Sequence, residues 1–132
     1  MTSLSSITYQ RGQIWMVDFG QPIGHELGME HPAVIVSERS LNNLASRLGH
    51  LIVVPGTSTR IENPRTGKLL ASHQDVPHSK VNGLAHKTYF MAEHVRSLST
   101  QRLRRPTGML EPDLLRALDD RLCLVVDLFQ KT

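Results

Sequence analysis

The sequence is poor in cysteine, in long apolar runs and in targeting signals. Its 132 residues contain one cysteine, Cys123, which excludes an intramolecular disulfide and a cysteine-based metal site. The longest aliphatic run spans residues 122–126 and is far too short to cross a bilayer. Residues 1–6 have neither a basic start nor an apolar core, so we expect no signal peptide. These absences predict a cytoplasmic protein without a membrane partner.

Several catalytic and cofactor-binding signatures are also missing. No Gly-x-Ser-x-Gly segment occurs, which argues against a serine hydrolase. Gly20, Gly24 and Gly28 are not followed by Gly-Lys-Ser/Thr, so they do not predict a phosphate-binding loop. The seven histidines are dispersed, and no two of them have the helical i, i+4 spacing of a metal site. We therefore expect neither a metal nor another cofactor.

The length and the charge fit one domain with room for an anionic partner. A chain of 132 residues is long enough to bury a modest core and has no room for a second domain. We expect residues 1–10 to form a flexible tail and residues 11–132 to form a single domain. The formal net charge of +3 permits an anionic partner without requiring one. The basic side chains are locally dense at Arg102, Arg104 and Arg105, and at Arg60, Arg65 and Lys68.

The hydrophobic pattern predicts strands first and a long helix last. Strands are expected at residues 13–18, 33–37, 51–55 and 89–93. A short helix is expected at 39–46, and the polar segment 60–81 should contain turns and one edge strand near 69–72. This order predicts a mainly β (α+β) fold, a small curved antiparallel sheet or barrel with helices on one side.

The C-terminal helix is the clearest element of the sequence. Pro112 suits its first position, and the helix should run for about five turns. Its opposite face is polar and includes Arg116 and Asp120. The apolar residues recur at helical spacing, as expected of a helix packed on a sheet: Leu114, Leu115, Leu118, Leu122, Val125, Val126 and Phe129.

Two strand ends carry the side chains best suited to chemistry. A glycine-containing loop at residues 24–32 leads into the second strand, and Pro32 holds His31 in an extended conformation at the strand entrance. The third strand ends in a cluster of hydroxyls that includes Thr57. Neighbouring strand ends can bring an imidazole and a hydroxyl to one site.

An ordered set of short motifs carries a resemblance to a known family. The chain resembles the PemK/MazF family of toxin endoribonucleases from about Tyr9 to Phe129. The motifs, in the family's order, are Arg11-Gly12-Gln13-Ile14-Trp15, the segment from Gly24-His25-Glu26 to Pro32-Ala33-Val34-Ile35-Val36-Ser37, Val54-Pro55-Gly56-Thr57-Ser58, Glu93-His94-Val95-Arg96-Ser97-Leu98 and Arg102-Leu103.

This resemblance implies a fold, an activity and partners. The fold would be the small SH3-like antiparallel barrel that this family shares with the gyrase-directed CcdB toxins. The activity would be metal-independent, sequence-specific cleavage of single-stranded RNA, leaving a 2′,3′-cyclic phosphate and a 5′-hydroxyl. The protein would be a homodimer and the toxin of a type II toxin–antitoxin pair, and the acidic tail of a cognate antitoxin would occupy its RNA groove.

The resemblance also assigns site residues, with one departure from the family. Thr57 matches the family's catalytic threonine, but the position before Pro32 is His31 where the family has an arginine. Histidine keeps the capacity for proton transfer, because its ordinary pKa is about 6.5, but it loses the permanent charge. The expected catalytic residues are thus His31 and Thr57, and the expected RNA-binding residues are His25, Glu26, Ser58, Thr59, Arg60, Glu93 and Arg96.

Each of these residues also has a structural interpretation. His31 can be a core histidine, and the Thr57 hydroxyl can cap the end of its strand. Arg60 either supplies the cation that His31 lacks or is simply solvated, and Glu93 and Arg96 can form an internal ion pair. The alternative function is a catalytically silent or protein-binding domain of the same fold, for example a gyrase poison, that lost its nuclease activity through His31.

Overall fold

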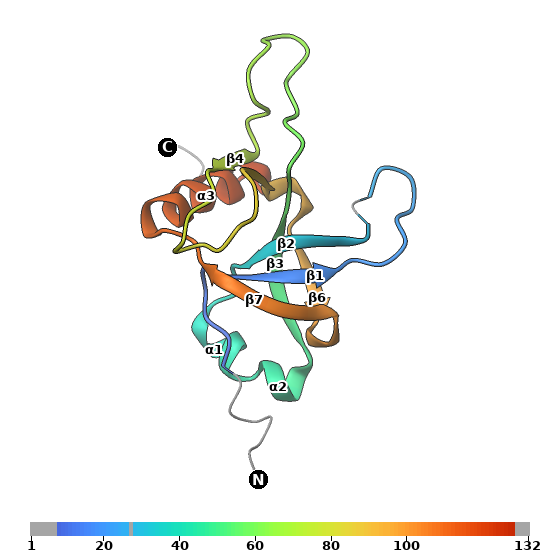
Figure 1. The fold of residues 1–132 in the computed structure, drawn as a ribbon, viewed down its shortest axis with the longest axis vertical. Coiled ribbons are helices and arrows are strands. Elements are labelled where there is room, and N and C mark those ends of the chain that lie inside the picture. Colours follow the sequence, from blue (N-terminus) through green and yellow to red (C-terminus); the bar gives the residue numbers. More distant parts are fainter. Residues whose placement is uncertain (1–7, 27, 129–132) are drawn as a thin grey trace.

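A computed structural model of the protein describes residues 8–26 and 28–128. The chain forms a seven-stranded antiparallel sheet, with a helix following the last strand (Figure 1). The strands are β1 (Gln13–Asp18), β2 (Glu30–Ile35), β3 (His50–Thr57), β4 (His73–Val76), β5 (Thr88–Met91), β6 (Arg96–Ser99) and β7 (Leu103–Met109). The helices are α1 (Arg39–Asn43), α2 (Ala45–Leu48) and α3 (Pro112–Val125), with 3₁₀ helices η2 (Ala92–His94) and η3 (Thr100–Arg102).

The strand β3 is the centre of the sheet. The order is β4-β5-β3-β2-β1-β7, and β6 pairs with β3 as well. On one side of β3 lies β2, with Ala33 opposite Pro55. On its other side β6 pairs with the first half of β3, β5 pairs with its last residues, and η2 packs beside β3. The end of β3 is therefore flanked by β5, and η2 packs beside β3 between the residues that pair with β6 and those that pair with β5.

The sheet buries both of its faces, and alternate residues of each strand belong to different cores. One core contains Ile14, Val34 and Val54 and is covered by α3, whose Leu118 is completely buried. The other core contains Val17, Phe19, Ala33, Ile35, Ala45, Leu51, Val53 and Leu98. The register of the strands thus assigns every side chain near the end of β3 to one face or the other.

The predicted fold class is confirmed, with changes in the element boundaries. β2 begins at Glu30 rather than at residue 33, because β2 pairs with β1 up to the Asp18–Glu30 pair. β3 continues to Thr57, because β5 pairs with its last two residues. The helix expected at 39–46 is two short helices that meet at Leu44.

Three further predictions are corrected by the structure. The edge strand expected near 69–72 is β4 at His73–Val76, preceded by an isolated bridge between Glu62 and Leu69. The strand expected at 89–93 ends at Met91, where η2 begins. The last helix has Pro112 in its first turn as predicted, but it spans 14 residues, or about four turns, and Phe129 lies outside the described residues.

Residues 1–7 of the expected tail also lie outside the described residues. Tyr9, at the end of that expected tail, packs against Trp15 with 5.9 Å between the ring centroids. The polar connection between β3 and β4 projects away from the sheet (Figure 1). The side chains that sequence analysis selected lie on the β1–β2 loop and the start of β2, at the end of β3 and in the connection after it, and on η2 and the start of β6.

Candidate functional site

His31 lies on the face of the sheet that also carries Phe19. It is two residues before Ala33 on β2, and Ala33 belongs to the same core as Val17 and Phe19. Alternation along the strand places all of these side chains on one face. In agreement, the rings of His31 and Phe19 lie 6.5 Å apart, with their planes tilted by 53°. The imidazole is thus directed to this face at the entrance of β2.

Thr57 follows the same rule on the neighbouring strand. Val53 belongs to the core of Phe19, so Pro55 and Thr57 are on that face as well. The Thr57 hydroxyl oxygen accepts a hydrogen bond of 3.2 Å from the backbone N–H of Thr59. This bond is the capping interaction that the residue type suggests, and it leaves the hydroxyl proton free to be donated to a ligand.

A cavity of about 410 Å³ opens on this face. We call it the cationic cavity, and its lining residues are Phe19, Gln21, Glu26, Pro55, His94, Arg96 and Arg102. The Arg96 guanidinium carbon lies 5.6 Å from the ring centroid of Phe19, in a cation–π contact. No described residue forms a salt bridge with Arg96 or Arg102, so the cavity presents two cations to a ligand.

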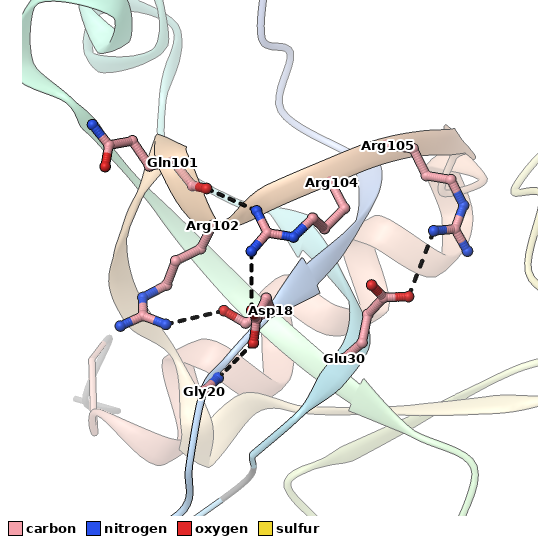
Figure 2. Close-up of polar contacts among 7 residues, drawn as sticks. All are labelled: Asp18, Gly20, Glu30, Gln101, Arg102, Arg104 and Arg105. Atoms are coloured by element: carbon pink, nitrogen blue, oxygen red, sulfur yellow. Dashed lines mark hydrogen bonds and ion pairs between the residues drawn. The ribbon is translucent and has the colours of Figure 1, made fainter.

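The arginines of the η3–β7 segment differ in how far they are neutralised (Figure 2). Arg104 is paired with the carboxylate of Asp18 at 2.9 Å, and Arg105 reaches Glu30 at 3.5 Å. Arg102 donates only to the backbone carbonyl of Asp18, at 3.2 Å. The backbone N–H of Gly20 and the side chain of Arg104 lower the pKa of Asp18 below its ordinary value. Arg102 therefore keeps the most available charge of the three.

Glu93 does not form the ion pair with Arg96 that sequence analysis considered. Its carboxylate instead accepts hydrogen bonds from the Ser72 hydroxyl at 2.7 Å and from Nε2 of the fully buried His73 at 2.8 Å. Burial raises the pKa of Glu93, but hydrogen bonding, led by the bonds from Ser72 and His73, contributes to a net pKa below its ordinary value. The same carboxylate lies 3.9 Å from Nε2 of His94.

The other expected RNA-binding residues are spread around the site. Glu26 borders the cationic cavity and accepts a hydrogen bond of 3.1 Å from the backbone N–H of Ile23, and His25 is exposed beside it. Arg60 donates to Glu62 at 3.0 Å rather than lining the cavity. Thr59 is exposed in the β3–β4 connection. Arg96 and Arg102, not Arg60, are thus the cations of the cavity.

Ser58 borders a second cavity, of about 370 Å³, on the opposite face of the sheet. This cavity is also lined by Thr88, Arg105 and Thr107, and His31 contributes to its rim. The two cavities are separated by the sheet at the ends of β2 and β3. Ser58 therefore lines this second cavity and not the cationic cavity.

Among the residues of the cationic cavity that sequence analysis missed, Phe19, His94 and Arg102 carry the aromatic and cationic groups. Two of them stand inside the short motifs that carried the family resemblance, since His94 follows Glu93 and Arg102 precedes Leu103. Their position in those motifs was the available signal. Among residues 8–26 and 28–128, no three His, Cys, Asp or Glu side chains gather into a group that could hold a metal ion. The described helices include none that is long and apolar enough to span a membrane.

Comparison with known proteins agrees with this architecture. Residues 10–126 match the family model of the PemK-like, MazF-like toxin of type II toxin–antitoxin system. The chain is 37% identical over 122 residues to endoribonuclease MazF9 of Mycobacterium tuberculosis, and the match covers 91% of this chain and 98% of that protein.

Solved structures show the same fold. MazF from Deinococcus radiodurans superposes with a TM-score of 0.72 at 20% identity, covering 93% of this chain and 100% of that one. An endoribonuclease in complex with its cognate antitoxin, from a mycobacterial species, gives a TM-score of 0.65 at 20% identity, covering 92% and 97% of the two chains.

Proposed function

This chain belongs to the PemK-like, MazF-like toxin family of type II toxin–antitoxin systems, and on that premise we propose that it is an endoribonuclease that cleaves single-stranded RNA. The observation that carries the proposal is the contact of His31 with Phe19, which lines the cationic cavity, together with the position of Thr57 on the same face of the sheet by strand alternation. Imidazole, hydroxyl and guanidinium are the groups that cleavage of a phosphodiester requires in the absence of a metal.

The chemistry follows from the position of each group. His31 takes the proton of the 2′-hydroxyl, whose oxygen then attacks the adjacent phosphorus. Thr57 donates a hydrogen bond to a phosphate oxygen as negative charge develops on it. Arg96 and Arg102 hold the phosphate in the cavity by charge-assisted hydrogen bonds. The products are a 2′,3′-cyclic phosphate and a 5′-hydroxyl.

The partners proposed for this chain follow from the same family. It acts as the toxin of a pair in the cytoplasm, and a cognate antitoxin blocks the cationic cavity with an acidic segment. The solved mycobacterial relative was obtained in complex with its cognate antitoxin, which supports an antitoxin as the partner. The active form is a homodimer, and cleavage is specific for a short RNA sequence.

The alternative of a silent or protein-binding domain is not favoured. A relative aligned over 91% of this chain carries the name of an endoribonuclease, and the residues of the cavity suit a polyanion. A histidine at position 31 is itself a competent proton-transfer group. Nothing in the arrangement of the site therefore calls for a loss of activity.

Incubation of the purified protein with single-stranded RNA of mixed sequence, in the presence of EDTA, tests the proposal. We expect discrete fragments whose 5′ ends accept phosphate from polynucleotide kinase without prior phosphatase treatment. RNA left intact by the antitoxin-free protein, or cleavage that stops in EDTA and returns with Mg²⁺ or Mn²⁺, would contradict the proposed mechanism.

A further inference from the structure

His94 lines the cationic cavity, and His31 lies beside that cavity, against the ring of Phe19, which lines it. His94 ends η2, its side chain is 33% exposed, and it lines the cavity together with Pro55 and Arg96. Two histidines thus stand on one face of the sheet on opposite sides of β3. RNA cleavage by transesterification needs a base on the 2′-oxygen and an acid on the departing 5′-oxygen, and two imidazoles can fill both roles.

The strand register gives the spacing of the two rings. Ala33 is opposite Pro55 in the last pair of β2 and β3, and extending this register by two residues would set His31 level with Thr57. Val53 is opposite Arg96 on β6, so the same continuation on the other side brings His94 beside Pro55, where η2 packs on β3. Two strand spacings across β3, combined with the offset of two residues along it, place the backbones of His31 and His94 about 12 Å apart. A phosphodiester between two inward-pointing imidazoles fills such a gap.

The charges around the two histidines differ, and this difference assigns their roles. The Glu93 carboxylate lies 3.9 Å from Nε2 of His94 and offers a counter-charge to its protonated form. Ser72 and His73 fix that carboxylate in place. Arg96, Arg102 and Glu26 are the other charged groups around the cavity. The ring of His31 packs against Phe19 instead, with no salt bridge to any described carboxylate, so it lacks the carboxylate partner that His94 has.

We propose that His94 is the general acid of RNA cleavage and that Glu93 is the residue that positions it. The inference rests on the proposed ribonuclease function. The bond from O2′ to phosphorus forms while the bond from phosphorus to O5′ breaks. His31 accepts the 2′-hydroxyl proton, and His94 donates a proton to O5′. Exchange with water returns both rings to their starting states, and no oxidant or reductant takes part.

A substrate with sulfur in place of the 5′-bridging oxygen at the mapped cleavage site tests this role directly. A thiolate leaves without being protonated, so a general acid is not needed for this substrate. His94→Ala should slow cleavage of ordinary RNA by roughly 10²–10⁴, the usual range for general acid–base catalysis. On the sulfur substrate the same variant should remain within about tenfold of the wild type.

Control variants separate this role from others. His31→Ala should be slow on both substrates, because the base is needed for both, and His78→Ala, at an exposed histidine outside either cavity, should be normal on both. The alkaline limb of the pH–rate profile should disappear in the His94→Ala variant. His94→Gln, which keeps the shape of a polar side chain, replaces it if thermal unfolding shows that the alanine variant is unfolded.

Two results would overturn the inference. One is an equal loss on both substrates in a folded His94 variant, which would make His94 a binding or structural residue. The other is a variant within threefold of wild type on both substrates. Wild-type protein that cleaves neither substrate would instead contradict the proposed ribonuclease function, so the two failures are distinct.

Discussion

The rings of Phe19 and His31 lie 6.5 Å apart at the ends of β1 and β2. Phe19 is almost completely buried, and its ring also carries Arg96 at 5.6 Å. One aromatic side chain therefore fixes both the imidazole and the cation on the face of the proposed site. This contact connects residues that sequence analysis selected with residues that it did not.

The first prediction concerns His31. Because its imidazole is proposed as the base, the cleavage rate should fall on the acid side of the pH profile, where a base becomes protonated. His31→Ala should remove this acid limb and slow cleavage by roughly 10²–10⁴. His31→Arg should restore activity without the limb, since it recreates the family's cation before Pro32. Single-turnover cleavage rates between pH 5 and 9 test this prediction. A pH profile like that of the wild type in the alanine variant would show that His31 takes no part in catalysis.

The second prediction concerns the Thr57 hydroxyl. Thr57→Ala should reduce the cleavage rate by about 10²–10³, because it removes a donor to the developing charge on the phosphate. Thr57→Ser, which keeps the hydroxyl, is the matched control and should stay close to the wild type. Cleavage rates at saturating RNA concentration test this prediction, and thermal unfolding checks that each variant is folded. An alanine variant within threefold of wild type would return Thr57 to a purely capping role.

The third prediction uses salt to count the cations that contact RNA. The logarithm of RNA affinity should fall with the logarithm of salt concentration by about 0.7 for each phosphate neutralised. Arg96→Ala should reduce the magnitude of this slope by about 0.7, the value for one phosphate, because Arg96 has a cation–π contact but no salt bridge to a described residue. Arg47→Ala, on α2 and outside the cationic cavity, should leave the slope unchanged. A flat response in the wild type would favour a protein target instead.

The fourth prediction concerns acid stability. The pKa of Glu93 in the folded protein lies below its ordinary value of 4.5, so its hydrogen bonds stabilise the fold above that pH. This stabilisation is lost as the pH falls through the folded pKa. Glu93→Gln should therefore weaken the dependence of the urea midpoint on pH below about 5. Glu62→Gln, at an exposed ion pair, is the control, and an unchanged pH dependence in the Glu93 variant would contradict the assignment.

The fifth prediction is a dimer in solution. The last turn of α3 and the residues after it expose Leu124, Val126 and Leu128, each at least half accessible to solvent. A second copy of the chain would bury such a surface. Sedimentation at micromolar concentration should give about twice the chain mass of 14.8 kDa. A mass that stays at the monomer value at all concentrations would contradict the prediction.

Some of this structure was determined by the sequence alone, because its signals are local. The apolar repeat and Pro112 placed α3 on the sheet, although its end came earlier than predicted. The apolar run of β3 and the hydroxyls after it located Thr57. Pro32 indicated an extended backbone at His31, and this position proved to lie inside β2. Each of these features depends on neighbours a few residues apart in the chain.

The remainder was decided only by tertiary structure. β7 is basic, contains Pro106 and lies at the edge of the sheet, so its sequence has no apolar alternation that would predict a strand. Its pairing with β1 alone makes it a strand. His94 reaches the face of Phe19 because η2 packs beside β3. The partners of Glu93 and Arg60 were likewise settled by which charged atoms folding brought within hydrogen-bond reach. Strand pairing joins residues far apart in the chain, and charged side chains choose partners by distance in space, which no local pattern contains.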